Sequence, residues 1–398
     1  PSVVVADGGK ATCVWVGDGH VYAERFIPEF GWTDYRRIDT GGPTADDPQT
    51  TTSPDGDAVV VWTQDGEVVA NCFEVGSGWQ GPEVVSTPGG APARAPTVGT
   101  SDDGETVVVW EEDGNVVSRC FDPVGGWTAP TPVATPVAPA SAPDVAVADD
   151  GDAVAVWTEN DGGVVASTFD ALTDTWTAPV PLGTGSAPSV AVDEDDGAVV
   201  VYVDGDDVKA TNLDPVQGWS APVPVPVPTP VMDEPARTPD VGMNGDGDAI
   251  VVFETDGETY ASRQAPAGAF EEARPLAPGI PVTGTPQVAL DDEGNAMAVF
   301  EGTDGHVRSS VFREAYDRWS PPADRGAGQE PVVDVNDRGE AISVYVIDGA
   351  IGATRINDLD PTVPRQLSLV IQGQGAVADG DALLDCPPGP GTCTTPVP

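Results

Sequence analysis

The stretch that decides the fold is AVVVWTQDGEVVANCF, residues 58–73. It opens with five apolar residues, 58–62, and an unbroken run of this length favours a strand buried on both faces. Asp65-Gly66 separates this run from a second apolar run at residues 68–70. An Asp-Gly pair between two apolar runs is a strong hairpin signal, because glycine tolerates a positive φ. The stretch therefore predicts a β-hairpin whose first strand is buried.

The same hairpin signal recurs along the chain. Successive Asp-Gly pairs begin 47, 48, 48, 43, 52, 48 and 44 residues apart. A period of roughly 20–50 residues indicates a solenoid, a propeller or an array. In the second unit a segment led by Pro48 precedes the hairpin and Gly78-Trp79 follows it, so each unit reads as four short strands. The eight pairs begin at Asp18, Asp65, Asp113, Asp161, Asp204, Asp256, Asp304 and Asp348.

Four short strands per unit leave both faces of a sheet uncovered, and stacking the sheets radially covers them. Immunoglobulin-like domains need about 100 residues and seven strands each, so the period excludes them. We therefore expect an all-β propeller with eight blades of four-stranded antiparallel sheet. Seven blades plus a divergent unit is the alternative, because the eighth unit lacks the Gly-Trp segment and residues 362–369 would have to supply its outer strand.

The domain organisation follows from the repeat. Residues 1–364 are assigned to the propeller, and residues 365–398 to a C-terminal extension that forms a partial small β module. The inner strand of the first unit starts at Pro1, which leaves no N-terminal strand to complete the last blade. We expect the ring to close by packing between the first and eighth units.

Aromatic residues fall into register with the repeat. One series ends the second strand of each unit, from Trp15 and Trp62 to Tyr345, and another holds the Gly-Trp position. All ten tryptophans belong to these two series, and blade-to-blade packing is their simplest interpretation. The alternative makes the Gly-Trp residues platforms for sugar stacking. The candidate ligand-binding residues are then Trp32, Trp79, Trp127, Trp176, Trp219 and Trp319.

The formal net charge is −48, from 17 Lys and Arg against 65 Asp and Glu. Such a charge repels phosphates and anionic lipid, which argues against nucleic acid and against membrane as partners. The acids gather in turns such as Asp55-Gly56-Asp57, so we expect them to coat the rims of the ring. Only two lysines are present, Lys10 and Lys209, and acidic, lysine-poor surfaces are typical of proteins adapted to high salt.

No catalytic site is identified. His20 and His306 each follow the Asp-Gly of a hairpin and are interpreted as turn-tip residues outside any triad. The arginines are interpreted as scattered, with none recurring at a fixed position of the repeat. This argues against the arginine-based sugar site of fucose-binding propeller lectins.

One turn has the spacing of a calcium loop. Asn244, Asp246 and Asp248 place side-chain oxygens at alternate positions, and Ca²⁺ takes several oxygen ligands from a short loop. They are the candidate metal ligands, with a solvated acidic turn as the competing interpretation. The turns at 149–152 and 193–196 are denser in charge but less regular in spacing.

The cysteines divide into two groups. Cys386 and Cys393 bracket a proline- and glycine-rich loop in the tail, where they are expected to form a disulfide in an oxidising compartment. Cys13 is interpreted as a small buried apolar residue. Cys72 and Cys120 occupy equivalent points in neighbouring units, which we expect to be too far apart for a disulfide.

Two resemblances accompany this pattern. The unit P-x-V-x-V…G-x-A-x-x-V-W…D-G-x-V…F…G-W, over residues 1 to about 360, resembles repeats of secreted bacterial and archaeal propellers of the sialidase-like and lectin-like kind. Residues 367–377, with the two tail cysteines, resemble the start of the divergent InlB B-repeat module, a small β domain of cell-surface proteins. Both resemblances imply an extracellular or cell-surface protein.

We therefore expect a non-catalytic extracellular binding or adhesion module with a glycan or a surface protein as partner. The first alternative is a structural subunit of a surface layer or filament, which implies self-assembly. The second is a divergent glycosidase or lyase. The chain begins at Pro1 without a signal peptide, so we expect a mature or trimmed form.

Overall fold

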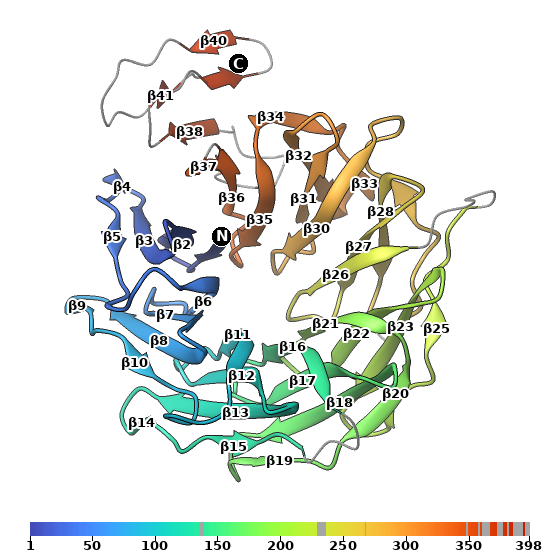
Figure 1. Cartoon of the computed structure of the whole chain (residues 1–398). Helices are drawn as coiled ribbons and strands as arrows, with labels where there is room; N and C mark the ends of the chain where they lie inside the picture. The colour runs from blue at the N-terminus through green and yellow to red at the C-terminus, as the bar shows by residue number, and fades with distance from the viewer. Residues whose placement is uncertain are drawn as a thin grey trace.

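In a computed structural model, eight antiparallel sheets surround a common axis and form an eight-bladed β-propeller (Figure 1). The structure describes residues 1–134, 139–228, 236–266, 268–347, 349–356 and 359, and the backbone of strands 367–371, 377–379, 382–384 and 393–394. The prediction of eight blades is confirmed, and the alternative of seven blades plus a divergent unit is wrong. No helix among the described residues is long and apolar enough to cross a membrane.

Each blade starts with an inner strand and continues into a hairpin of two long strands. The inner strands are β1 (Ser2–Val5), β6 (Asp46–Thr52), β11 (Ala93–Thr100), β16 (Ala140–Val147), β21 (Ser186–Val192), β26 (Arg237–Met243), β30 (Val282–Leu290) and β35 (Gln329–Val335). The second strands are β2 (Ala11–Gly17), β7 (Ala58–Gln64), β12 (Thr106–Glu112), β17 (Ala153–Glu159), β22 (Ala198–Asp204), β27 (Ala249–Thr255), β31 (Ala296–Gly302) and β36 (Ala341–Ile347). The third strands are β3 (His20–Ile27), β8 (Glu67–Glu74), β13 (Asn115–Asp122), β18 (Gly163–Asp170), β23 (Asp207–Asp214), β28 (Glu258–Gln264), β32 (His306–Arg313) and β37 (Ala350–Ile356).

The fourth segment of most blades is two short strands, both paired with the third strand. In blade 1 these are β4 (Gly31–Trp32) and β5 (Arg36–Arg37). The corresponding pairs are β9 (Gly78–Trp79) and β10 (Glu83–Val84), β14 (Gly126–Trp127) and β15 (Thr131–Pro132), β19 (Thr175–Trp176) and β20 (Val180–Thr184), β24 (Gly218–Trp219) and β25 (Val223–Pro224), and β33 (Arg318–Trp319) and β34 (Ala323–Ala327). A 3-10 turn, η1 (Glu314–Tyr316), precedes β33.

Blades 6 and 8 depart from this plan. Blade 6 has a single short outer strand among its described residues, β29 (Arg274–Pro275). In blade 8, β38 (Leu367–Ile371) pairs with β37, so a segment overlapping the expected 362–369 does supply the outer strand. β38 also pairs with β41 (Cys393–Thr394), and β39 (Val377–Asp379) pairs with β40 (Ala382–Leu384). Residues of the predicted extension therefore contribute to the sheet of blade 8.

The hairpin of blade 2 forms as its sequence predicts. Asp65 and Gly66 both have positive φ, 53° and 81°, which is the backbone of a type I′ turn. This turn sets the register that pairs Trp62 with Val69. The apolar run of β7 is consequently buried on both faces of the sheet.

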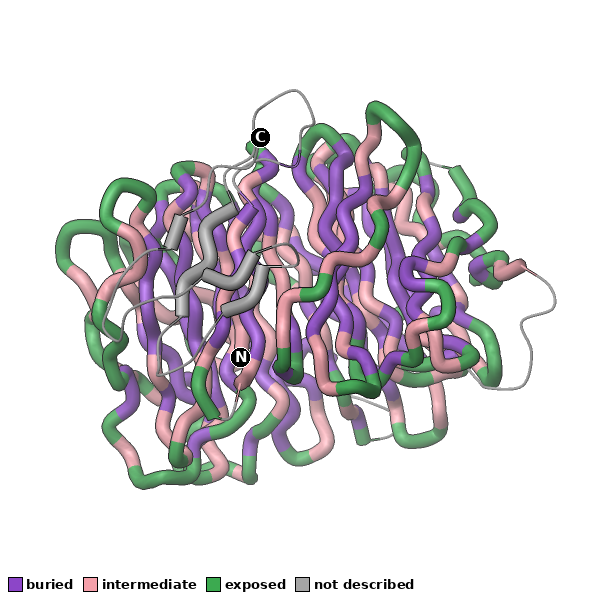
Figure 2. Tube along the Cα trace, turned by 90° about the horizontal axis from the view of Figure 1, so that it is seen from above, coloured by how far each residue is buried: buried purple, intermediate pink, exposed green. Residues whose placement is uncertain are grey.

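The core is divided into eight apolar clusters, one at each contact between neighbouring blades. Figure 2 shows buried residues along the strands and exposed residues in the loops at both ends of the ring. The large aromatic residues that end the second strands, such as Trp62, Trp110 and Trp157, are fully buried in these clusters. Trp15 is half-buried at the contact between blades 8 and 1. Packing is therefore the role of this series.

The ring closes through contacts between blades 8 and 1, as expected. Val3 and Val5 of β1 pack in one cluster with Ile342 and Val344 of β36. The Val5 N–H donates to Asp334 Oδ2 at 2.6 Å, and Asn336 Nδ2 donates to the Ala6 carbonyl at 2.9 Å. No strand is exchanged between the two blades within the described residues, because β1 is the inner strand of blade 1.

Candidate functional site

The described cavities lie between neighbouring blades and at one end of the central axis. Because the sheets are antiparallel, the loop after the first strand and the turn after the third strand of a blade lie at the same end of the ring. We call this end the acidic face. Its loops are residues 6–10, 53–57, 101–105, 148–152, 193–197, 244–248, 291–295 and 336–340.

A cavity of about 600 Å³ lies between blades 1 and 2 and is here named the blade 1–2 groove. Strand β3 and the segment carrying β4 and β5 form one wall, and Phe73 with residues 76–79 forms the other. Trp79 is half-buried, and its ring meets Phe73 in a T-shaped contact with 5.4 Å between centroids. The polar side chains of the groove are Arg25, Thr33, Asp34, Arg36 and Ser77.

Arg25 forms the floor of this groove and is buried, with 7% of its surface exposed. Its Nη1 donates to Thr12 Oγ1 at 2.8 Å and its Nη2 to the Gly56 carbonyl at 2.7 Å. The guanidinium lies 3.8 Å from the centroid of the Phe73 ring. Burial lowers the pKa of Arg25 to about 10, although Asp57 attracts its charge. It forms no ion pair with a described residue.

A second cation stands beside Arg25. Lys10 ends the first loop of blade 1, and its Nζ donates to the Asp55 carbonyl at 3.1 Å. A Cβ at Gly56, whose φ is 92°, would lie 3.2 Å from Lys10 Cδ and 3.6 Å from Arg25 Nη2. The two cationic side chains thus converge on one glycine of blade 2.

Two other arginines occupy the register of Arg25, so the expectation that no arginine recurs at a fixed position is wrong. Arg263 in blade 6 and Arg355 in blade 8 each follow the turn glycine by six residues, as Arg25 does. Like Arg25, each lies over the phenylalanine of the next blade, Phe312 and Phe26 respectively. The sequence signal for these arginines is their constant spacing of six residues after the glycine of an Asp-Gly pair.

The three arginines differ in their partners. Arg263 pairs with Asp248 and Glu314, both at 2.9 Å, and Arg355 pairs with Glu340 at 2.7 Å. Asp248 and Glu340 end the first loop of their blades. Blade 1 holds Lys10 at that position, so its arginine meets a cation where the other two meet a carboxylate.

The equivalent groove between blades 4 and 5 has the opposite charge. Its cavity measures about 300 Å³, and Asp152 and Thr168 stand where blade 1 has Lys10 and Arg25. Asp196 takes the place of Gly56, and burial raises the pKa of both Asp152 and Asp196.

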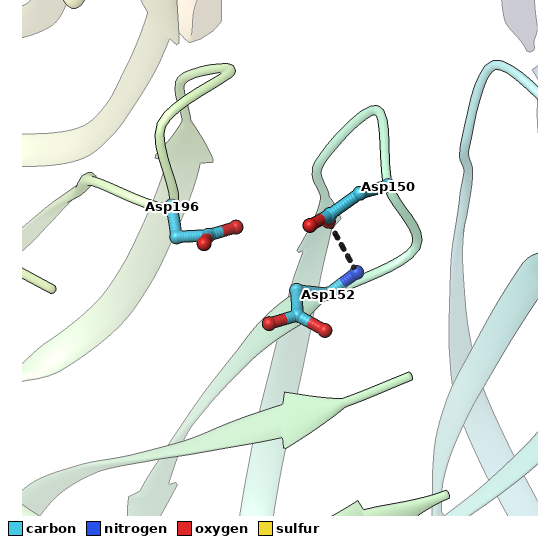
Figure 3. Close-up of side chains that lie close together, drawn as sticks. All are labelled: Asp150, Asp152 and Asp196. Carbon is cyan, nitrogen blue, oxygen red and sulfur yellow. Dashed lines mark hydrogen bonds between the residues drawn. The ribbon is translucent and has the colours of Figure 1, made fainter. Parts of the chain in front are cut away.

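Figure 3 shows how three carboxylates meet beside this cavity, with oxygens within 4.8 Å of one another: Asp150, Asp152 and Asp196. Asp150 Oδ1 accepts the Asp152 N–H at 3.0 Å, and Asp152 Oδ1 accepts the Ala171 N–H at 2.8 Å. Asp196 Oδ1 is buried without a hydrogen-bond partner among the described residues. Ca²⁺ takes six to eight oxygen ligands, so three carboxylates supply part of such a shell.

Carboxylates also surround the axis on the acidic face. A cavity of about 170 Å³ there is lined by Asp102, Asp149, Glu194, Asp292 and Asp337 from five different blades. Burial, together with repulsion from Asp292 and Asp7, raises the pKa of Asp337 to about 7. Burial and neighbouring carboxylates also raise the pKa of Asp102, Asp149 and Asp292. The axis is therefore a strongly negative region of the molecule.

The expected calcium turn is held by protein contacts. Asn244 is buried, its Oδ1 accepts the Asp248 N–H at 2.8 Å, and its Nδ2 donates to the Asp292 carbonyl at 3.1 Å. Asp248 pairs with Arg263. Asp246 is exposed in the same turn. Calcium at these three residues stays a prediction.

The Gly-Trp residues lie half-buried at the outer edges of the blades. Five of the six face the phenylalanine that ends their third strand, with 5.1–5.5 Å between centroids. Arg119 lies over Trp127 at 5.5 Å, and Trp176 Nε1 donates to Ser118 Oγ of the preceding blade at 2.8 Å. Trp79 lines the blade 1–2 groove together with Arg25 and Arg36, whose guanidinium groups form no ion pair with a described residue.

Both histidines have carboxylate neighbours that the sequence did not indicate. His20 Nδ1 lies 3.2 Å from Asp39 Oδ1, and His306 Nδ1 lies 2.9 Å from Asp324 Oδ2. Cys13, Cys72 and Cys120 are free thiols. The predicted disulfide lies outside the described residues, since Cys386 is not described and only the backbone of Cys393 is.

No family model matches the chain, and no curated protein matches it. Among solved structures, the Dos1 propeller is 12% identical over 89% of this chain and 90% of its own, with a TM-score of 0.55. An ulvan lyase of polysaccharide lyase family 25, bound to -[GlcA(1-4)Rha3S]-, is 10% identical over 78% of this chain and 91% of its own, with a TM-score of 0.51. The fucose-specific lectin from Aleuria aurantia is 12% identical over 69% and 92%, with a TM-score of 0.43. At these identities the likeness to the Dos1 propeller and to the ulvan lyase shows the propeller fold alone.

Proposed function

We propose that this propeller is a non-catalytic binding module that works outside the cell and takes a glycan in the blade 1–2 groove. The observation that carries the proposal is Trp79, a half-buried aromatic ring that lines a cavity together with hydroxyl, carboxylate and guanidinium groups. Ligand sites of this kind combine an aromatic or apolar wall with a few polar groups that fix orientation. A sugar ring offers both a C–H face for the ring and hydroxyls for Thr33, Asp34 and Ser77.

The test is a glycan array probed with the wild-type chain and with Trp79→Ala. We expect the wild type to bind a defined set of glycans and Trp79→Ala to lose that binding, because the stacking surface is removed. Trp127→Ala is the matched control, since Trp127 has the same position in blade 3 but is covered by Arg119. A variant at Trp79 that binds the same glycans as the wild type would contradict the site.

A second candidate function, a self-assembling structural subunit, is favoured by a different observation. Turns between the third and fourth strands of six blades each present an exposed apolar side chain, and four of these are 85–99% exposed. The six residues are Phe30, Val75, Val124, Leu172, Val216 and Tyr316. Contiguous exposed apolar surface marks contact sites, and association of copies through these turns would bring the six side chains into such contacts.

Assembly through these tips would show in sedimentation velocity at high salt, where charge repulsion is screened. We expect the wild type to associate as protein concentration rises, and the triple variant Val124→Asp, Leu172→Asp, Val216→Asp to stay monomeric. A wild-type chain that is monomeric at every concentration and salt level would exclude this function.

A further inference from the structure

We propose that the blade 1–2 groove selects an anionic sugar, one that carries a carboxylate or sulfate group on its ring. This inference rests on the proposed glycan-binding function and adds the chemical class of the ligand. Arg36 and Arg25 would hold the anionic group while Trp79 holds the sugar ring.

The first argument is that the groove has positive charge left over. Arg36 is exposed, lines the cavity and forms no ion pair with a described residue. Arg25 is buried at the floor, and its Nη1 and Nη2 donate to a hydroxyl and to a carbonyl, which are neutral acceptors. Asp34 is the one carboxylate of the lining. Asp57 attracts the charge of Arg25 without forming an ion pair with it. A buried charge without a directly paired counter-ion is costly, and an anionic ligand would offset part of that cost.

The second argument is that the two other arginines in the register of Arg25 have no such surplus around them. In blades 6 and 8 the corresponding arginines are neutralised by Asp248 and Glu340, which end the first loop of their own blades. Blade 1 has Lys10 there instead. In a chain with 17 basic and 65 acidic residues, two arginines that line one groove, with Lys10 beside one of them, stand out against the general composition.

The third argument concerns geometry. Guanidinium groups bind carboxylates and sulfate-like oxyanions through paired N–H donors, which makes arginine suited to such groups. Arg36 lies on β5 at the open side of the groove, where it pairs with Ala23 of β3. Trp79 lies across the cavity on β9. The cavity of about 600 Å³ therefore has an aromatic wall on one blade and a cationic wall on the other.

The experiment compares a tetragalacturonate with its fully methyl-esterified, uncharged counterpart and with a sulfated tetrasaccharide, by isothermal titration calorimetry in 0.15 M and 2 M KCl. We expect at least one of the two acidic probes to bind at least tenfold more tightly than the ester. Tighter binding of the tetragalacturonate would indicate a carboxylate site, and tighter binding of the sulfated tetrasaccharide would indicate a sulfate site.

Two variants test the residues. Arg36→Gln should lose at least tenfold in affinity for the acidic probe and leave the ester unchanged, because one charge-assisted contact is removed. Lys10→Asp should have the same effect by giving Arg25 the carboxylate partner that Arg263 and Arg355 already have. Arg274→Gln is the matched control: Arg274 pairs with Ala261 as Arg36 pairs with Ala23, and it contacts Glu271 in blade 6. It removes the same charge and should bind like the wild type.

The outcomes separate the two levels of the proposal. Equal binding of acid and ester, lost in Trp79→Ala, would overturn the anionic preference and keep the glycan-binding function. Absence of binding to every probe and to the glycan array would overturn both. A loss of acidic binding in Arg274→Gln equal to that in Arg36→Gln would mean that only the overall charge matters, which would also overturn the proposal. Melting curves of each variant confirm that it is folded.

Discussion

Asp240 illustrates how single residues of the inner strands connect the blades. Its Oδ2 accepts the Val288 N–H of the next blade at 2.8 Å, just as Asp334 accepts Val5 and Asp144 accepts Val190. An inner strand is the edge of its sheet, so its outward N–H groups have no strand partner and need another acceptor. These aspartates supply it. The same burial raises the pKa of Asp240 and of Asp334 to about 7.

The raised pKa values predict how stability depends on pH. A carboxyl whose folded pKa lies above its unfolded value of about 3.9 stabilises the folded state fully below that value, and this stabilisation is lost as pH rises through about 7. We therefore expect Tm to rise by several degrees between pH 8 and pH 5, measured by differential scanning calorimetry. Asp240→Asn keeps an acceptor for the Val288 N–H and removes the titration, so its Tm should change less over this range. A wild-type Tm that falls from pH 8 to pH 5 would contradict the prediction.

At the scale of elements, the hairpin of each blade follows from local sequence and the outer edge does not. Asp65-Gly66 sets the turn and the register of β7 and β8, because turn geometry and apolar alternation are both encoded within a few residues. The fourth segment carries little apolar sequence, and in most blades it splits into two short strands that both pair with the third strand of the same blade. Blade 8 takes β38 from residues 367–371, after a longer connection than in the other blades.

The aromatic series show why position in a repeat does not by itself assign a role. Trp110 and Trp127 belong to one blade, yet Trp110 is fully buried and Trp127 is half-buried beneath Arg119. The prediction of packing is confirmed for the second-strand series, where the apolar run itself implies burial on both faces. For the Gly-Trp series the sequence left packing and sugar stacking open. Each of these rings packs at the contact with the preceding blade, and that blade decides how much of the ring remains exposed.

At the scale of the whole molecule, the net charge of −48 sets the conditions under which the ring is stable. The acids of the acidic face approach one another across the axis, as the raised pKa of Asp337 reflects. Electrostatic self-repulsion of this kind weakens as salt shortens the Debye length from about 10 Å at 0.1 M to about 3 Å at 1 M.

We therefore expect Tm to increase between 0.05 M and 2 M KCl, followed by circular dichroism at 218 nm and constant pH. Equal ionic strength supplied as NaCl should give the same increase, since screening depends on charge rather than on ion identity. A Tm that is flat over this range would remove salt adaptation as the explanation of the acidic surface. The acids would then need another role, such as the binding of cations.

The sequence by itself determined the repeat, its hairpins and the burial of the second strands, because periodicity and turn chemistry are local properties of the chain. The choice between eight blades and seven plus a divergent unit was made by the structure. Only the tertiary structure decided which charges meet. Arg25 and Arg36 come from one unit and Trp79 from the next, and they line one groove because blade 1 packs on blade 2. The groove between blades 4 and 5 has the same backbone register and carboxylates instead. A contact between units depends on side chains about one repeat apart, and no pattern within a single unit encodes it.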